Sequence, residues 1–137
     1  MKKQQNYHYQ LYYHIILTVK YRKSIIEKYN TDIKEIIEDL SKKSNFKIEK
    51  IESDKNHLHI LISSRPDISP SHIIKSIKQV TTYELWQRYE NELMKEFWKK
   101  HEFWTRSYFI SSIGSVSKEA IERYIINQGN SSVKLKL

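Results

Sequence analysis

The fold of this chain is constrained most strongly by the order of its predicted strands and helices, which are told apart by the spacing of their apolar residues. Residues 9–20 alternate apolar and polar side chains, which is typical of a strand with one buried face. Residues 25–43 carry apolar side chains three and four positions apart, which predicts an amphipathic helix. Residues 46–53 return to a strand-like spacing, but Ile48 and Ile51 fall out of phase, and a β-bulge would restore the alternation.

The rest of the chain continues to alternate between the two element types. A turn at 54–56 leads into a strand that ends near Ile62, so these two strands form a predicted hairpin. The next predicted element is a helix from Pro70 to Tyr89, with Ser69 as its N-cap, followed by a charged segment at 90–101 that is a loop or a short helix. A strand at 103–113, closed by Gly114, and a helix from Ser115 or Ser117 to Gly129 complete the order.

Strand, helix, strand, strand, helix, strand is the split βαβ order of ferredoxin-like and RRM-like α+β folds, followed here by one further helix. We therefore expect an antiparallel sheet with two helices on one face and the other face open. No internal repeat or linker divides the chain, so we expect a single domain over residues 1–137, with a core at about 9–130 and a tail at 131–137.

The composition points to a polyanionic partner. The formal net charge is +8, and ten tyrosines and three tryptophans lie among the cations. Cations hold a nucleic-acid backbone while aromatic faces stack on unpaired bases, although a lysine- and isoleucine-rich composition also arises from an AT-rich genome. The sequence has no apolar run of about 18 residues, so we expect no membrane span. It has no cysteine and no targeting signal, which favours the cytoplasm.

The strand at 56–62 contains a pair of histidines on one face. His57 and His59 fall on the face opposite Leu58, Ile60 and Ile62, because successive side chains of a strand point to opposite sides. Neutral imidazole is a common metal ligand in proteins, and two imidazoles at alternate positions of a strand can bind one ion. The pair is therefore a candidate metal site.

The predicted last helix carries a second candidate group. Tyr124 and Gln128 are four residues apart, which places them one above the other on the same helix face. By themselves they are interpreted as a tyrosine at the edge of a packing stripe and a glutamine that caps it.

Four motifs together resemble one family, the single-tyrosine HUH transposases of small bacterial insertion sequences, which are related to rolling-circle replication initiators. These motifs are Lys20-Tyr21-Arg22 after the first strand, His57-Leu58-His59, the aromatic segment from Trp104 to Gly114, and the segment from Tyr124 to Gln128. Many members of the family have Asp directly before the first histidine. This chain has Asn56 there and Asp54 two residues earlier, so the motif leaves open whether His57 has a carboxylate partner.

The resemblance implies a metal-assisted tyrosine nuclease and strand transferase. His57, His59 and Gln128 would hold a divalent ion, Mg²⁺ or Mn²⁺, which polarises the scissile phosphate. Tyr124 would attack as the nucleophile and give a covalent 5′-phosphotyrosine and a free 3′-hydroxyl. The family also implies a homodimer whose last helix docks on the partner's histidine pair, with a helix packed on its own domain as the alternative.

The resemblance implies single-stranded DNA with hairpin ends as the substrate. Lys20, Tyr21, Arg22 and Arg106 are the predicted DNA contacts. Three further histidines are predicted to be surface or DNA-facing residues and not ligands, namely His14, His72 and His101. Two alternatives stay open, namely a non-catalytic nucleic-acid-binding module on the same fold and a related HUH hairpin endonuclease or replication initiator.

Overall fold

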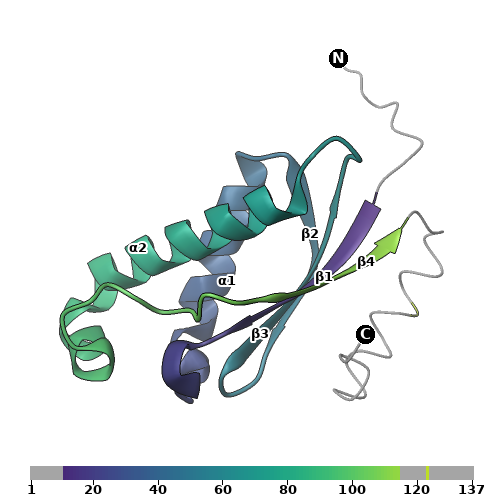
Figure 1. Cartoon of the computed structure of the whole chain (residues 1–137). Coiled ribbons are helices and arrows are strands. Elements are labelled where there is room, and N and C mark those ends of the chain that lie inside the picture. The colour runs from purple at the N-terminus through teal and green to yellow at the C-terminus, as the bar shows by residue number, and fades with distance from the viewer. Residues whose placement is uncertain (1–10, 115–122, 124–137) are drawn as a thin grey trace.

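The computed structural model describes residues 11–114 and residue 123 of the chain (Figure 1). Its elements are, in order, strand β1 (Leu11–Thr18), the short 3-10 helix η2 (Lys20–Arg22), helix α1 (Ile26–Lys42), strands β2 (Phe46–Ser53) and β3 (His57–Ser64), helix α2 (Pro70–Phe97) and strand β4 (Phe109–Gly114). The predicted element order is therefore confirmed up to Gly114. Apart from residue 123, the predicted last helix and the tail lie outside the described residues.

The four strands form one antiparallel sheet in the order β2-β3-β1-β4. Both helices lie on the same side of this sheet, and α2 passes in front of α1 in the view of Figure 1. The predicted ferredoxin-like α+β fold is confirmed. Strand β1 lies at the centre because it pairs with both β3 and β4, although it comes first in the chain.

The hydrophobic core fills the layer between the sheet and the two helices. Strand β1 contributes Tyr13, Ile15 and Leu17, and Val19 follows directly after it on the same face; each is at most 7% exposed. Strand β3 contributes Leu58, Ile60 and Ile62, as its alternation predicts. The buried hydrophobic residues of the helices are Ile26, Tyr29, Ile33, Ile36 and Ile37 in α1, and Ile73, Ile74, Ile77, Leu85, Trp86, Leu93 and Phe97 in α2.

Strand β2 contains the predicted bulge. Its register against β3 shifts between Ile48 and Lys50, so Glu49 is the extra residue. The shift brings Ile48 opposite Ile62 and Ile51 opposite Ile60, which restores contact between apolar positions that strict alternation would separate. The predicted β2–β3 hairpin is confirmed as well.

Helix α2 begins as predicted but ends later. The side chain of Ser69 accepts a hydrogen bond from the backbone N–H of His72 at 3.4 Å, and Pro70 occupies the first helical position. Tyr89, the predicted last residue, has non-helical angles (φ −133°, ψ 39°) and marks a kink, after which the helix continues to Phe97. The charged segment after Tyr89 is thus helical up to Phe97.

The fourth strand begins later than predicted. It starts at Phe109 rather than Phe103, and within residues 103–108 only Trp104 forms a β-bridge, to Val19. The backbone of 103–105 still hydrogen-bonds to the end of β1, with Lys20 donating to Phe103 and Thr105 donating to Thr18, both at 2.8 Å. The same segment also contacts α2. The indole N–H of Trp104 donates to the Thr81 hydroxyl at 2.8 Å. The ammonium group of Lys78 donates to the carbonyl oxygens of Thr105 and Arg106, at 2.7 and 3.0 Å.

Neither helix of the described part of the chain combines the length and the apolar run that a membrane crossing needs.

Candidate active site

Strand β3 places the two histidines side by side on the sheet face away from the helices. His57 lies opposite Thr18 and His59 opposite Ile16 in the β1–β3 ladder. The ring centroids of the two histidines are 6.1 Å apart, and their planes differ by 36°. His57 is partly exposed, whereas His59 is 8% exposed. The prediction that both imidazoles share the face opposite the core is confirmed.

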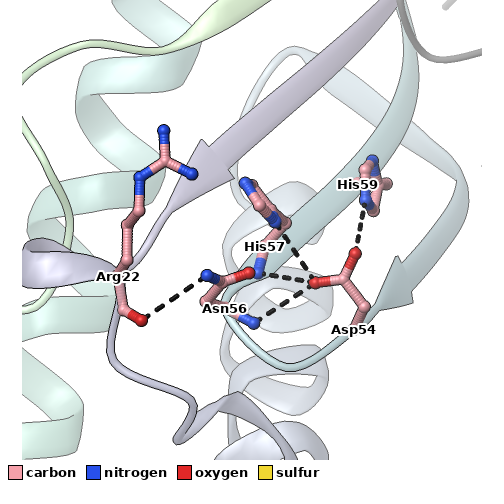
Figure 2. Close-up of polar contacts among 5 residues, drawn as sticks. All are labelled: Arg22, Asp54, Asn56, His57 and His59. Carbon is pink, nitrogen blue, oxygen red and sulfur yellow. Dashed lines mark hydrogen bonds and ion pairs between the residues drawn. The ribbon is translucent and has the colours of Figure 1, made fainter.

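Asp54 joins the two imidazoles. Its carboxylate oxygens lie 3.4 Å from Nδ1 of His57 and 3.4 Å from Nε2 of His59 (Figure 2). One of these oxygens, Oδ1, also accepts hydrogen bonds from the backbone N–H groups of Asn56 and His57, at 3.2 and 2.9 Å. The turn therefore folds back over the start of β3, and Asp54 gives His57 the carboxylate partner that the motif left open.

The local electrostatics keep His59 neutral and Asp54 ionised. Burial lowers the pKa of His59 below its usual 6.5, and the nearby Asp54 carboxylate opposes this only in part. Burial by itself would raise the pKa of Asp54, but the hydrogen bonds with His59 and His57 outweigh it and lower that pKa. Neutral imidazole is the form that binds metal ions.

A third histidine, His14, lies beside this pair. It is fully buried, and its ring centroid is 6.0 Å from that of His59. Burial, and next the proximity of His59, lower its pKa to about 4. The prediction of His14 as a surface or DNA-facing residue is wrong, because β1 is the central strand and His14 sits between Leu61 of β3 and Ser111 of β4. Its place on the same face as His57 was the signal that the sequence offered.

The other two histidines with surface predictions are exposed. His72 lies in the first turn of α2. His101 stacks on the ring of Trp86, with centroids 4.2 Å apart.

The Lys20-Tyr21-Arg22 motif forms η2, directly next to the histidine strand. The backbone N–H of Val19 donates to the carbonyl oxygen of Asn56 at 2.9 Å, and the Asn56 side chain donates to the carbonyl oxygen of Arg22 at 3.5 Å (Figure 2). Lys20 pairs with Glu102 at 3.2 Å. Of the predicted DNA contacts, three thus lie together at the end of β1.

Arg106, the fourth predicted DNA contact, lies in the segment before β4. It is exposed, and the neighbouring Thr105 donates its backbone N–H to the carbonyl oxygen of Thr18 at 2.8 Å. This hydrogen bond places Arg106 near the same end of β1.

The backbone of η2 is strained. Tyr21 and Arg22 have φ of 61° and 53°, in the left-handed region that bulky residues rarely adopt. Each such residue costs about 1–3 kcal/mol and persists only where the surrounding structure holds it. Strain of this kind is concentrated at functional sites, which is consistent with a role for η2 beyond connecting β1 to α1.

The donor chemistry of the histidine pair suits a divalent ion. Two imidazoles share one strand face, and Nδ1 of His59 is buried without a hydrogen-bond partner among the described residues. Within residues 11–114 and 123, no three His, Cys, Asp or Glu side chains form a group that could hold a metal ion. Tyr124 and Gln128, the predicted nucleophile and third ligand, lie outside the described residues, so their placement remains a prediction.

A cavity of about 300 Å³ lies at the other end of β3, away from the histidines. Its lining includes Phe46, which pairs with Ser64 at the far end of the strand, and Ser69 and His72 at the start of α2. Six residues of β3 lie between His57 and Ser64, which puts these two residues roughly 23 Å apart. The candidate active site is therefore the sheet face that carries the histidines, and not this cavity.

Comparisons with known proteins identify the family. The family model described as "Transposase IS200 like" matches residues 7–128. The ISDra2 transposase TnpA of Deinococcus radiodurans is 29% identical over 129 residues, which cover 93% of this chain and 91% of that protein. The transposase for insertion sequence element IS200 of Salmonella typhimurium is 27% identical over 118 residues, which cover 85% of this chain and 75% of that protein.

Solved structures agree with this assignment. A crystal structure of a Deinococcus radiodurans R1 protein assigned as a transposase has a TM-score of 0.70 and 25% identity, covering 93% of this chain and 98% of that one. A REP-associated tyrosine transposase bound to a REP hairpin has the same fold, with a TM-score of 0.62 and 12% identity over 95% of this chain and 73% of that one. From its sequence and its fold, the chain belongs to the family of IS200-like transposases.

Proposed function

We propose that this transposase cleaves and rejoins single-stranded DNA at hairpin-bearing element ends through a covalent 5′-phosphotyrosine intermediate. The observation that carries the proposal is the pair His57 and His59 on β3, joined by Asp54, in a chain of the IS200-like family. Hairpin DNA as the substrate class is supported by a neighbour of the same fold that is bound to a REP hairpin.

Tyr124 is the proposed nucleophile. Its phenolic oxygen attacks the scissile phosphorus, the bond from phosphorus to the 3′-oxygen breaks, and the 3′-oxygen gains a proton to become a hydroxyl. The phenolic proton must be lost in the attack, since a free tyrosine has a pKa near 10. The phosphotyrosine keeps the energy of the phosphodiester, so a second 3′-hydroxyl can reverse the attack and rejoin the strand without ATP.

His57 and His59 would hold a divalent ion, with Gln128 as the third ligand. When bound, the ion would polarise the scissile phosphate and neutralise charge that develops in the transition state. Two nitrogen donors and an amide oxygen suit Mn²⁺ better than Mg²⁺, because magnesium prefers oxygen ligands. Asp54 would orient the two rings, as carboxylates commonly do for histidine ligands.

The working enzyme is proposed to be a homodimer with shared sites. Strand β4 ends at Gly114, and a short polar segment, 115–117, separates it from the predicted helix that carries Tyr124 and Gln128. A glycine at this joint would let that helix reach the histidine pair of the partner. The alternative is a helix that completes the site of its own chain.

Covalent trapping tests the reaction. Labelled single-stranded DNA with the element's own ends is incubated with the protein and Mn²⁺, and denaturing gel electrophoresis reports a covalent adduct. Tyr124→Phe is expected to form no adduct while binding the hairpin nearly as well as the wild type, because binding rests on phosphates and stacking. Unchanged adduct formation by Tyr124→Phe would reject this nucleophile.

Mixed dimers test the sharing of sites. Tyr124→Phe and His57→Ala are each expected to be inactive, but a heterodimer of the two has one intact site if tyrosine and histidines come from different subunits. Cleavage by verified heterodimers therefore supports shared sites. Inactive heterodimers would instead support assembly within one chain.

A further inference from the structure

Two exposed aromatic rings lie together at the end of β1. Tyr21 of η2 is 55% exposed, and Trp98, the residue after α2, is 67% exposed. Their ring centroids are 5.8 Å apart in an edge-to-face arrangement. The buried ring of Phe97 lies almost parallel to that of Tyr21, with centroids 6.4 Å apart, and so supports the pair from within the core.

The backbone holds both rings in place at a conformational cost. Within the described part of the chain, the non-glycine residues with positive φ are Tyr21, Arg22 and Trp98. Trp98 has φ 58° and ψ −129°, a combination that non-glycine residues rarely adopt. The strained positions come from two segments distant in sequence, yet they meet at one place, which argues for selection of the surface that they present.

Cations surround the aromatic pair. The ammonium group of Lys20 lies 5.7 Å from the ring centroid of Tyr21. Lys99 and Lys100 follow Trp98 directly and are exposed. The guanidinium of Arg22 is exposed and has no ion-pair partner within residues 11–114 and 123, whereas Lys20 is paired with Glu102. Arg22 is therefore available to a phosphate.

We propose that Tyr21 and Trp98 form a stacking platform for an unpaired base of the DNA strand that is cleaved at the histidine pair. The inference rests on the proposed function, which supplies single-stranded DNA as the partner. Single-strand binding proteins combine a basic surface with exposed aromatic rings in the same way, because every base offers a flat face to stack on.

The position of the platform matches this role. Thr18 lies opposite His57 in the sheet, and η2 begins two residues later. The Asn56 side chain, directly before His57, donates to the carbonyl oxygen of Arg22 (Figure 2). Arg22 in turn follows Tyr21 in η2. A strand whose phosphate lies at His57 can therefore place Arg22 on a neighbouring phosphate and a nearby base on the rings.

The test measures binding of the full-length protein to a fluorescein-labelled thymidine 20-mer by anisotropy, in chelator to prevent cleavage. Tyr21→Leu and Trp98→Leu are each expected to weaken binding about 5- to 150-fold, the range of one base stack. Trp98→Phe retains a ring and recovers most of the affinity, which separates stacking from misfolding. Arg22→Ala lowers the slope of log affinity against log salt by about 0.7.

Tyr83→Leu is the matched control. Tyr83 is 63% exposed on α2, and no ring or cation contact to it is found among the described residues, so its loss leaves the affinity unchanged. Fluorescence gives a second measurement. Trp86 and Trp104 are 2% and 6% exposed, so quenching of tryptophan emission by the bound 20-mer comes from Trp98 and disappears in Trp98→Leu.

Three other outcomes would contradict the stacking platform, and each has a different meaning for the proposed function. If Tyr21→Leu and Trp98→Leu bind like the Tyr83→Leu control while the wild type still forms the covalent adduct, the platform is wrong and the proposed function stands. A second outcome in light scattering is that Trp98→Leu dissociates the dimer while its affinity for the 20-mer is unchanged. In that case the rings form a contact between copies of the chain. If the wild type binds neither the 20-mer nor hairpin ends, platform and function both fail.

Discussion

Replacing Asp54 separates two roles of its carboxylate. Oδ1 accepts hydrogen bonds from the backbone N–H groups of Asn56 and His57, and the two oxygens face the imidazoles of His57 and His59 at 3.4 Å each. Asp54→Asn keeps an oxygen for the backbone but loses the negative charge, whereas Asp54→Ala loses both. The two variants therefore affect folding stability and metal binding differently.

The expected magnitudes follow from these contacts. Two backbone hydrogen bonds at about 0.5–1.5 kcal/mol each would make Asp54→Ala about 1–3 kcal/mol less stable. Because the side chain is 51% exposed, water replaces part of what is lost, and we expect a value near the lower end. Asp54→Asn stays within about 0.5 kcal/mol of the wild type. Both variants lose the charge that orients the imidazoles, which lowers Mn²⁺ affinity about 10- to 100-fold.

Two measurements check this reasoning. Urea denaturation followed by circular dichroism gives the free energy of unfolding, and electron paramagnetic resonance of free Mn²⁺ gives the metal affinity. Wild-type affinity in Asp54→Asn would show that the carboxylate does not orient the rings. An Asn variant as unstable as Asp54→Ala would show that Oδ1 does not hold the turn. A wild type without Mn²⁺ binding would refute the metal site itself.

Three further predictions concern the core and the metal. Thr81→Val leaves the buried indole N–H of Trp104 without its partner and lowers the free energy of unfolding by about 1–3 kcal/mol; a loss below the error of urea denaturation would contradict this. Burial and the hydrogen bond to Glu92 raise the pKa of Tyr29, so stability is retained below pH 10 and falls as the pH rises above it. Above pH 10, the melting temperature of Tyr29→Phe should fall less steeply with pH than that of the wild type. Equal slopes for the two proteins would count against a raised pKa of Tyr29. Excess chelator should stop strand cleavage without releasing bound hairpin DNA, and full activity in chelator would exclude the metal.

Features set by neighbouring residues in the chain were predictable from the sequence. The bulge in β2 follows from the broken alternation at Ile48 and Ile51, and the start of α2 follows from Ser69 and Pro70. The shared face of His57 and His59 follows from the geometry of any strand. The central pair of the candidate site was therefore predictable, while the roles of Tyr124 and Gln128 stay predictions.

Features set by tertiary contacts were not predictable. The burial of His14 requires knowing that β3 and β4 flank β1 on both sides. The contact of Asp54 with both imidazoles depends on a turn that folds back over its own strand. The gap between the Trp104 bridge and Phe109 coincides with contacts to α2, in which Lys78 donates to the carbonyl oxygens of Thr105 and Arg106.

The extension of α2 has the same origin. At the kink, α2 contacts α1 through the hydroxyl of Tyr89, which donates to Asp32 at 2.7 Å, and through Arg88, which pairs with Asp32 and Glu35. Beyond the kink, Glu92 accepts a hydrogen bond from the hydroxyl of Tyr29 at 2.7 Å. These partners lie more than fifty residues earlier in the chain. A charged sequence alone does not indicate such contacts between helices.

The central place of β1 in the sheet has a consequence for how the chain folds during synthesis. Strand β1 is made early, but its two partners end at Ser64 and Gly114. At about 5–20 residues per second, the roughly 100 residues between β1 and the end of β4 take about 5–20 s to emerge. Strand β3 can pair with β1 once Ser64 has emerged, but the other edge of β1 stays unpaired until Gly114 is made. An unpaired strand edge can pair with another chain, which promotes aggregation. Slow translation between Ser64 and Gly114 would therefore lower the yield of folded transposase without changing its sequence.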